Sequence, residues 1–323
     1  MPEPALDIQQ VRKSFSGHVA VQNLSLQVPR GSVYGLLGPN GAGKTTTIRM
    51  ILDIIEPDSG TITVLGAPSA RGRVGNRIGY LPEERGLYKK MQVRRVLRFL
   101  AELKGVNRHE ADKRIDSWLT RLALTGEDRD WGDARVDELS RGMQQKVQFI
   151  GALLHEPELI ILDEPFSGLD PINAQALKDI VVDLRREGRT IIFSTHVMDN
   201  AEMLCDAVCI IARGEKVLDG AIAAVKAEHG GRYIALALGE DRSASDGVSA
   251  VLADRSLVRR IDDSNRTAEL ELAPNANAQA LLRRLIDAGA VVERFELVQP
   301  SLHRIFLDKV GATEVEPGMS GHG

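Results

Sequence analysis

A glycine-rich segment followed by a lysine and threonines has the residue types and spacing to bind phosphate groups. The segment GPNGAGKTTT fits the pattern G-x-x-x-x-G-K-[ST]. The glycines let backbone N–H groups turn towards phosphate oxygens, and the lysine adds a positive charge. An ordinary glycine-rich turn would not need the complete pattern, so we interpret the segment as a phosphate-binding loop. Its candidate ligand residues are Gly38, Asn40, Gly41, Ala42, Gly43, Lys44, Thr45 and Thr46.

Two carboxylates directly follow an apolar run further along the chain. The run Leu159–Leu162 has the composition of a buried strand, and Asp163 and Glu164 come next. At the carboxyl end of a parallel strand, Asp163 would lie beside the phosphate loop, where it and the Thr45 hydroxyl can hold Mg²⁺. Glu164 can then orient or deprotonate an attacking water molecule. The alternative is an acidic strand end that only faces solvent.

These groups can meet only if the strands that carry them share one parallel sheet. Val33–Leu37 contains no charged residue and runs directly into the glycine-rich loop, after which we predict a helix over Lys44–Ile54. The apolar runs Leu159–Leu162 and Thr190–Ser194 enclose the helical pattern of Ala174–Glu187. Strand, helix and strand over this length predict a parallel crossover unit. The sequence therefore predicts an α/β fold with a phosphate-loop NTPase core.

Two further pieces are expected to be attached to this core. Residues 5–12 and 19–28 predict strands of an antiparallel β subdomain, joined by a turn at Ser16-Gly17. Helical periodicity with many charges over about 85–155 predicts an inserted helical subdomain.

A change in composition after residue 220 predicts a domain boundary. We expect one domain at 1–220 and a small C-terminal α+β domain at 221–310, with alternating strand and helix patterns. The glycine-rich residues 311–323 are expected to be a disordered tail.

Length and composition limit the class of protein. The chain has 323 residues, of which 43% are hydrophobic and 27% are charged, and its formal net charge is −4. Neither domain has a basic excess, so we expect no nucleic-acid partner. The apolar run Ala207–Ala212 is far shorter than the roughly 20 residues of a membrane-spanning helix. With no signal-peptide pattern at the start and two cysteines, we expect a chain of the reducing cytoplasm.

A further motif resembles that of a known ATPase family. Residues 139–146, LSRGMQQK, resemble the signature of ABC ATPases, which usually reads L-S-G-G-Q. Ser167–Asp170 is similar to the family's loop that communicates across its dimer, and Ser194–His196 is similar to its switch-histidine segment. Phe15 stands where the family places an aromatic residue that stacks on adenine. The motifs occur in the family's order over roughly residues 5–220, and the chain is identified as a member.

The resemblance implies ATP as the ligand, Mg²⁺ as the cofactor, and a dimer. In the family, two ATP molecules lie between two ATPase domains arranged head to tail. Ser140 and the Gly142 N–H would lie at the start of a helix over about 141–154 and meet the γ-phosphate of the partner's ATP. Arg141 and Met143 depart from the usual signature, but its Ser-x-Gly core remains. The implied catalytic residues are Glu164, His196 and Lys44.

One departure from the family falls on a candidate metal ligand. The family usually has a glutamine where this chain has Glu83, after a strand predicted at Arg77–Leu81. Glutamate can still bind Mg²⁺, but it cannot donate a hydrogen bond when ionised. The candidate metal ligands are therefore Thr45, Asp163 and Glu83. The segment Tyr80–Tyr88, together with the C-terminal extension, resembles an exporter-type subgroup that includes sodium-export ATPase subunits.

The resemblance implies an ATP-hydrolysing subunit that powers transport through separate membrane permease subunits. It would export sodium ions, drugs or another small solute, and would work as a homodimer or with a related ATPase subunit. Its expected location is cytoplasmic, on the inner face of the cell membrane. Two alternatives stay open: a soluble ABC ATPase that acts on ribosomes or DNA, and a regulatory module in which the C-terminal domain binds a partner.

A basic segment beside Glu83 admits two interpretations. It contains no acidic residue and six basic ones, Arg85, Lys89, Lys90, Arg94, Arg95 and Arg98. It is either a solvated helix face or a docking surface near the permease and anionic lipid head groups.

Overall fold

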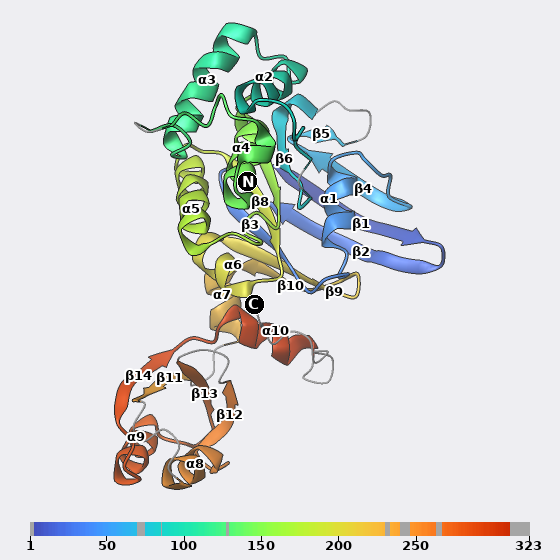
Figure 1. Ribbon diagram of the computed structural model, residues 1–323. Coiled ribbons are helices and arrows are strands. Elements are labelled where there is room, and N and C mark those ends of the chain that lie inside the picture. Colours follow the sequence, from blue (N-terminus) through green and yellow to red (C-terminus); the bar gives the residue numbers. More distant parts are fainter. Residues whose placement is uncertain are drawn as a thin grey trace. The chain divides into compact units, whose positions relative to one another are not determined.

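The structure divides the chain into two units, each with a core of its own. The computed structural model describes residues 3–69, 75–84, 86–126, 129–229, 233–239, 246–262 and 267–310. Contacts within the chain separate Met1–Ala221 from Ile222–Gly323 (Figure 1). The tail expected at 311–323 lies outside the described residues.

The first unit is built around a six-stranded sheet with the order β10-β9-β3-β8-β7-β6. Its strands are β3 (Val33–Leu37), β6 (Ile78–Leu81), β7 (Leu159–Asp163), β8 (Thr190–Thr195), β9 (Ala207–Ala212) and β10 (Glu215–Ala221). β10 pairs antiparallel with β9, and all the other neighbours are parallel. Every residue of β3, β7 and β8 is buried, as expected for strands covered on both faces. The predicted α/β core is confirmed, and α5 (Pro171–Arg186) makes the crossover from β7 to β8.

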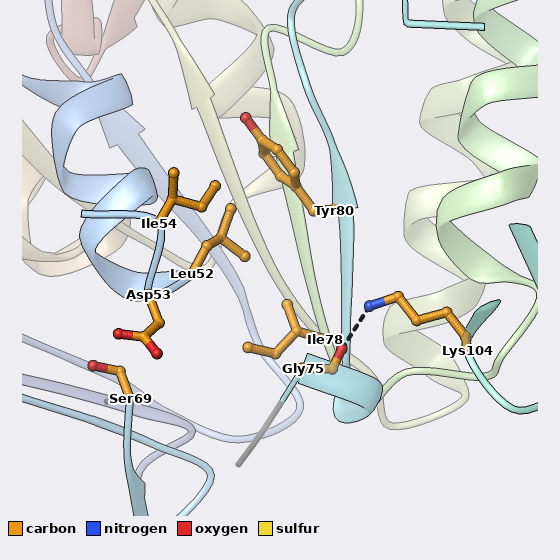
Figure 2. A pocket seen from close by; sticks show the side chains of 8 residues that line it. All are labelled: Leu52, Asp53, Ile54, Ser69, Gly75, Ile78, Tyr80 and Lys104. Carbon is orange, nitrogen blue, oxygen red and sulfur yellow. Dashed lines mark hydrogen bonds between the residues drawn. The ribbon is translucent and has the colours of Figure 1, made fainter. Parts of the chain in front are cut away.

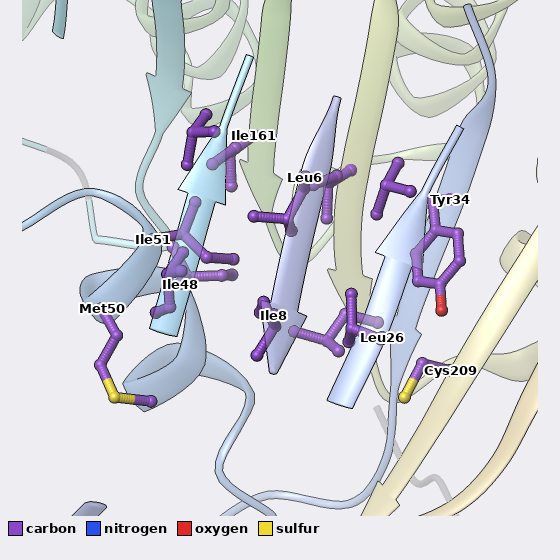
Figure 3. Close-up of a cluster of buried hydrophobic side chains, with 14 of the residues drawn as sticks. Leu6, Ile8, Leu26, Tyr34, Ile48, Met50, Ile51, Ile161 and Cys209 are labelled. Carbon is purple, nitrogen blue, oxygen red and sulfur yellow. The ribbon is translucent and has the colours of Figure 1, made fainter. Parts of the chain in front are cut away.

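A second, antiparallel sheet in this unit shares a hydrophobic core with the first. Its order is β2-β1-β4-β5, from β1 (Leu6–Phe15), β2 (His18–Val28), β4 (Ser59–Val64) and β5 (Ala67–Pro68). Leu6 and Ile8 of β1 lie in one buried cluster with Ile48 and Ile51 of α1 (Lys44–Ile51) and Ile161 of β7 (Figure 3). This cluster holds α1, and with it the loop that precedes α1, between the two sheets.

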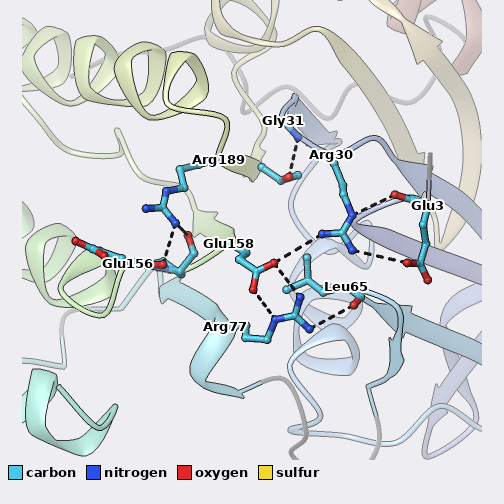
Figure 4. Close-up of polar contacts among 10 residues, drawn as sticks. Glu3, Arg30, Gly31, Leu65, Arg77, Glu156, Glu158 and Arg189 are labelled. Carbon is cyan, nitrogen blue, oxygen red and sulfur yellow. Dashed lines mark hydrogen bonds and ion pairs between the residues drawn. The ribbon is translucent and has the colours of Figure 1, made fainter. Parts of the chain in front are cut away.

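Charged side chains also connect segments that border the two sheets, at the amino ends of the parallel strands (Figure 4). Arg77 donates from Nε and Nη2 to the two carboxylate oxygens of Glu158, at 2.6 and 2.8 Å. Its Nη1 also donates to the Leu65 carbonyl at 3.3 Å. Arg30 forms two longer ion pairs, with Nη1 at 3.7 Å from Glu158 Oε2 and Nη2 at 3.9 Å from Glu3 Oε2. Since these side chains are well exposed, each ion pair contributes only about 0–1 kcal/mol.

The helical subdomain contains α2 (Val93–Leu103), α3 (Arg108–Arg121) and α4 (Arg141–Leu153), which lie together at one end of the first unit in Figure 1. α3 begins after Asn107, whose side chain accepts a hydrogen bond from Glu110 N at 3.0 Å. α4 begins after Ser140, whose hydroxyl accepts from Met143 N at 3.2 Å. Such caps satisfy N–H groups that have no partner within the helix.

One part of the basic segment is bound within the helical subdomain, and another part is exposed. Arg94 pairs with Asp116 and also with Asp130, the latter at 2.6 Å, and Arg98 pairs with Asp112 at 2.6 Å. These two arginines therefore hold α2 to the rest of the subdomain, which corrects the view of the whole segment as a free surface. The exposed members among the described residues are Lys89, Lys90 and Arg95, and Arg85 lies outside the described residues.

The second unit has a four-stranded antiparallel sheet with the order β12-β13-β11-β14. Its elements are α7 (Ile222–Glu228), β11 (Tyr233–Leu238), α8 (Asp246–Ala253), β12 (Val258–Asp262), β13 (Ala268–Leu272), α9 (Ala278–Asp287), β14 (Val292–Val298) and α10 (Leu302–Val310). Val248 of α8 and Leu281 and Leu285 of α9 are fully buried in one cluster with Ile234 of β11 and Leu270 of β13. The predicted α+β character of this region is confirmed.

Two predicted helix ends are wrong, for local reasons. α1 ends at Ile51 and not at Ile54, because Asp53 adopts φ +59°, in the left-handed region. α5 begins three residues earlier than predicted, because Asp170 caps it by accepting from Asn173 N at 3.0 Å and Pro171 suits a first helical position.

Among the described residues, three short α-helices were not predicted. α6 (Met198–Leu204), α7 and α8 have seven, seven and eight residues. About two turns are too few to display a helical period in the sequence.

Candidate functional site

The glycine-rich loop lies between the carboxyl end of β3 and the start of α1. Gly38 has φ +150° and Gly43 has φ +106°. A Cβ atom would lie 2.1 Å from the Ile211 carbonyl oxygen at the first position and 2.4 Å from the Ala20 carbonyl oxygen at the second. Only glycine fits at either position without moving the backbone, so both glycines are required by the path of the loop.

Lys44 is directed back into its own loop. Its side chain is buried, and Nζ donates to the carbonyls of Gly38 at 2.7 Å and Pro39 at 3.1 Å. Burial lowers the pKa of Lys44, and the nearby carboxylates of Glu164 and Asp163 act in the opposite direction. The ammonium group is therefore close to the carboxyl end of β7 and can bind an anion placed between them.

Asp163 ends β7 with its side chain almost completely buried. Oδ1 accepts from the Ser194 hydroxyl, and Oδ2 accepts from the Thr45 hydroxyl at 3.4 Å. Burial raises the pKa of Asp163, and the neighbouring Glu164 acts in the same direction, while the Ser194 hydroxyl and the Lys44 ammonium oppose them. A carboxylate placed beside a hydroxyl provides hard oxygen ligands of the kind that Mg²⁺ requires.

The described residues contain no cluster of three or more His, Cys, Asp or Glu side chains that could hold a metal.

Glu164 follows Asp163 in an unusual backbone conformation, with φ +46°. The residue is only 8% exposed, and its carboxylate meets the end of β8. Oε2 accepts from the Thr195 hydroxyl at 3.1 Å, and Oε1 lies 3.0 Å from His196 N and 2.7 Å from His196 Nδ1. The predicted catalytic pair of Glu164 and His196 is thus in direct contact.

A cavity of about 460 Å³ brings most of the predicted site together. Among its lining residues are the exposed aromatic Phe15, the loop from Asn40 to Thr46, and the carboxylates Glu83, Asp163 and Glu164. Phe15 is 46% exposed, with Lys13 Nζ 5.4 Å from its ring centre. A ligand with a flat ring at one end and phosphates at the other matches this lining.

Sequence reasoning missed two lining residues, His18 and Ala20. They reach the cavity because the β1–β2 hairpin pairs Phe15 with His18. This pairing could have been predicted from the tight turn at Ser16-Gly17, since such a turn places the residues on its two sides opposite each other.

The signature residues do not line this cavity. Ser140 is exposed at the start of α4, and Gly142 is buried against α5, where a Cβ atom would lie 2.7 Å from Asn173 Nδ2. Gly142 therefore serves close helix packing within the chain, while the exposed Ser140 is available to another molecule.

Glu83 lies between two hollows. Besides the cavity above, it lines a second one of about 420 Å³ together with Glu84, Gln145 and Glu164. Gln148 fixes this segment by donating from Nε2 to the Glu84 carbonyl at 3.0 Å.

A third hollow, of about 220 Å³, is largely apolar (Figure 2). Leu52 and Ile54, which follow α1, face Ile78 and Tyr80 of β6 across it. At its edge Lys104 Nζ donates to the Gly75 carbonyl at 2.6 Å, and burial lowers the pKa of this lysine.

Comparison with known proteins covers both units. Residues 21–167 match the family "ABC transporter", and residues 220–310 match "ATP-binding protein DrrA1-3-like, C-terminal domain". The described part of the chain contains no helix long and apolar enough to span a membrane.

Several relatives and solved structures are similar. The uncharacterized ABC transporter ATP-binding protein YhaQ of Bacillus subtilis is 42% identical, over 95% of this chain and 99% of that protein. The Nod factor export ATP-binding protein I of Rhizobium sp. (strain N33) is 35% identical, over 96% and 98%. The ABC transporter ATP-binding protein NatA of Bacillus subtilis is 41% identical, over 63% and 82%.

Among solved structures, an ATP-binding subunit of an ABC transporter has TM-score 0.64 and 31% identity, and the match covers 70% of this chain and 93% of that one. The matches to YhaQ and to the Nod factor export protein extend over both domains, and the phosphate loop, Asp163 and Glu164 line one cavity. The chain therefore belongs to the ABC transporter ATP-binding proteins and is an ABC ATPase that hydrolyses ATP.

Proposed function

We propose that this chain powers the export of a small solute through separate permease subunits in the membrane. The observation that carries the ATPase part is the cavity where Phe15, Lys44, Asp163 and Glu164 converge. The export part is supported by similarity along the full chain to a Nod factor export ATP-binding protein, and by similarity to NatA. The ATPase would act on the cytoplasmic side of the membrane.

We infer a separate role for each of these residues at the ATP site. Phe15 stacks on the base, with a contribution of about 1 kcal/mol. The loop N–H groups and Lys44 bind the β- and γ-phosphates. Glu164 orients and deprotonates the attacking water, and His196 holds Glu164. Ser140 of a second chain, in head-to-tail arrangement, closes the site over the γ-phosphate with the N-terminus of its α4.

Thr45, Asp163 and Glu83 are the residues that would hold Mg²⁺. When bound, the ion supplies positive charge that offsets the charge developing on the transferred phosphate. Asp163 is kept in place for this task by the hydroxyl of Ser194 and by its own burial.

The apolar hollow of Figure 2 is where we expect a permease segment to dock. Ile54 at its rim is 59% exposed, which favours an apolar partner. The exposed basic residues Lys89, Lys90 and Arg95 belong to the helical subdomain, whose Lys104 also lines this hollow, and would face anionic groups.

Glu83→Gln is expected to weaken Mg²⁺ binding modestly while ATP hydrolysis is retained. The amide keeps the shape of the side chain but loses the negative charge that attracts the ion. The measurement is ATPase rate against Mg²⁺ concentration at neutral pH. Glu84→Gln is the matched control, because Glu84 lines only the second hollow. Identical Mg²⁺ titrations for wild type and Glu83→Gln would exclude Glu83 as a ligand.

The proposed function is tested by fractionating cells that produce the full chain with and without the candidate permease. The chain should sediment with membranes only when the permease is present, and should be purified together with it. Lys44→Ala should still associate with the permease but fail to drive transport. Sedimentation with ribosomes, independent of any permease, would instead support a soluble ABC ATPase.

A further inference from the structure

The last two residues of β8 present hydroxyl groups to the two carboxylates at the end of β7. The strands are parallel neighbours, and Asp163 lies opposite Ser194 in the ladder. Ser194 Oγ donates to Asp163 Oδ1, and Thr195 Oγ1 donates to Glu164 Oε2 at 3.1 Å. Each carboxylate therefore has a hydroxyl of its own on the adjacent strand.

The direction of the Thr195 proton follows from its second partner. Val197 N donates to Thr195 Oγ1 at 3.0 Å, so this contact uses a lone pair of the hydroxyl. The single hydroxyl proton is left for Glu164. Thr195 is only 2% exposed, so water does not compete for it.

The two oxygens of Glu164 consequently have different surroundings. Oε2 accepts from the buried Thr195 hydroxyl, whereas Oε1 accepts from His196 N at 3.0 Å and lies 2.7 Å from His196 Nδ1, on a side chain that is 40% exposed. Glu164 lines both hollows at the site, and Thr195 lines neither of them. Thr195 thus touches the carboxylate without reaching the space that a nucleotide would occupy.

We propose that Thr195 is a positioning residue for ATP hydrolysis, which holds Oε2 of Glu164 while His196 holds Oε1, so that the carboxylate is fixed where it meets the attacking water. This inference rests on the proposed role of Glu164 as general base. A carboxylate with contacts at both oxygens has one rotational position, and such placement is what makes proton abstraction efficient.

The first test replaces Thr195 by valine, which keeps the shape and removes the hydroxyl. We expect kcat to fall by about 10-fold to 100-fold, the range for one hydrogen bond to a charged group, while KM for ATP stays unchanged. Thr195→Ser keeps the hydroxyl and should retain most of kcat. If Thr195→Val does not fold, Thr195→Ala should show the same loss of kcat. Wild-type kcat in a folded Thr195→Val or Thr195→Ala protein would overturn the proposal.

Thr190→Val is the matched control. Thr190 is a buried threonine at the other end of β8, and its hydroxyl accepts from Gly31 N at 2.9 Å. The substitution should lower the melting temperature and leave kcat unchanged. If it reduces kcat as much as Thr195→Val does, the effect comes from a general loss of strand stability and the proposal is wrong.

A double-mutant cycle separates this proposal from the role of Glu164 itself. In single-turnover measurements, Thr195→Val should change the residual rate of Glu164→Gln by no more than about twofold, because the group through which it acts is gone. A further 10-fold loss in that background would show that Thr195 acts elsewhere. If Glu164→Gln alone keeps the wild-type rate, the general-base role has failed instead.

Discussion

Glu164→Gln is expected to retain ATP binding and to lower kcat by about 10²–10⁴-fold, the usual contribution of a general base. The amide has the shape of the carboxylate, and its oxygen can accept from either Thr195 or His196 N, but it cannot take a proton from water. ATP binding is measured by equilibrium titration and turnover by phosphate release.

With hydrolysis blocked, ATP should stay between two chains, so a dimer should accumulate when ATP and Mg²⁺ are added. Size-exclusion chromatography with light scattering measures this directly. Glu158→Gln is a suitable control, since Glu158 lies at the opposite end of β7 and pairs with Arg77. A Glu164→Gln protein with wild-type turnover would remove Glu164 from the mechanism.

Ser140→Arg is expected to reduce hydrolysis by about 10²–10³-fold, as for loss of a group that stabilises charge in the transition state. The ATP affinity of the monomer should be nearly intact, because Ser140 is exposed and does not line the cavity of its own chain. The substitution also removes the cap of α4. Asn107→Ala removes the equivalent cap of α3 and is the control for that effect.

Mixing Ser140→Arg with Lys44→Ala tests the head-to-tail arrangement. Each protein alone should be inactive, but a mixed dimer contains one site with both lesions and one site with neither. Mixing should therefore restore hydrolysis. Equal loss of monomer ATP binding in both variants, or no recovery on mixing, would refute a site shared between two chains.

The parts of the site that the sequence predicted are those encoded by continuous segments. The phosphate loop is specified by glycines whose positions its backbone path requires, and Asp163 and Glu164 come directly after the four apolar residues of β7. Such local signals need no knowledge of distant neighbours. The ends of α1 and α5 were less predictable, because a left-handed residue and a side-chain cap decide them.

Other features depend on contacts between distant segments. Arg94 and Arg98 look like free surface charges in the sequence, yet their partners Asp112, Asp116 and Asp130 come from α3 and the loop after it. Likewise, the role inferred for Thr195 depends on the register between β7 and β8. A sequence pattern alone does not contain that register.

The hydrogen bonds that Lys44 makes with its own loop have a consequence for product release. Nζ donates to the carbonyls of Gly38 and Pro39. Departure of the products therefore leaves no buried cation without a partner, which would otherwise be strongly destabilising. Lys44 can exchange phosphate oxygens for the two loop carbonyls as acceptors, so the cavity does not have to collapse between turnovers. Product release would therefore not require the binding loop to refold.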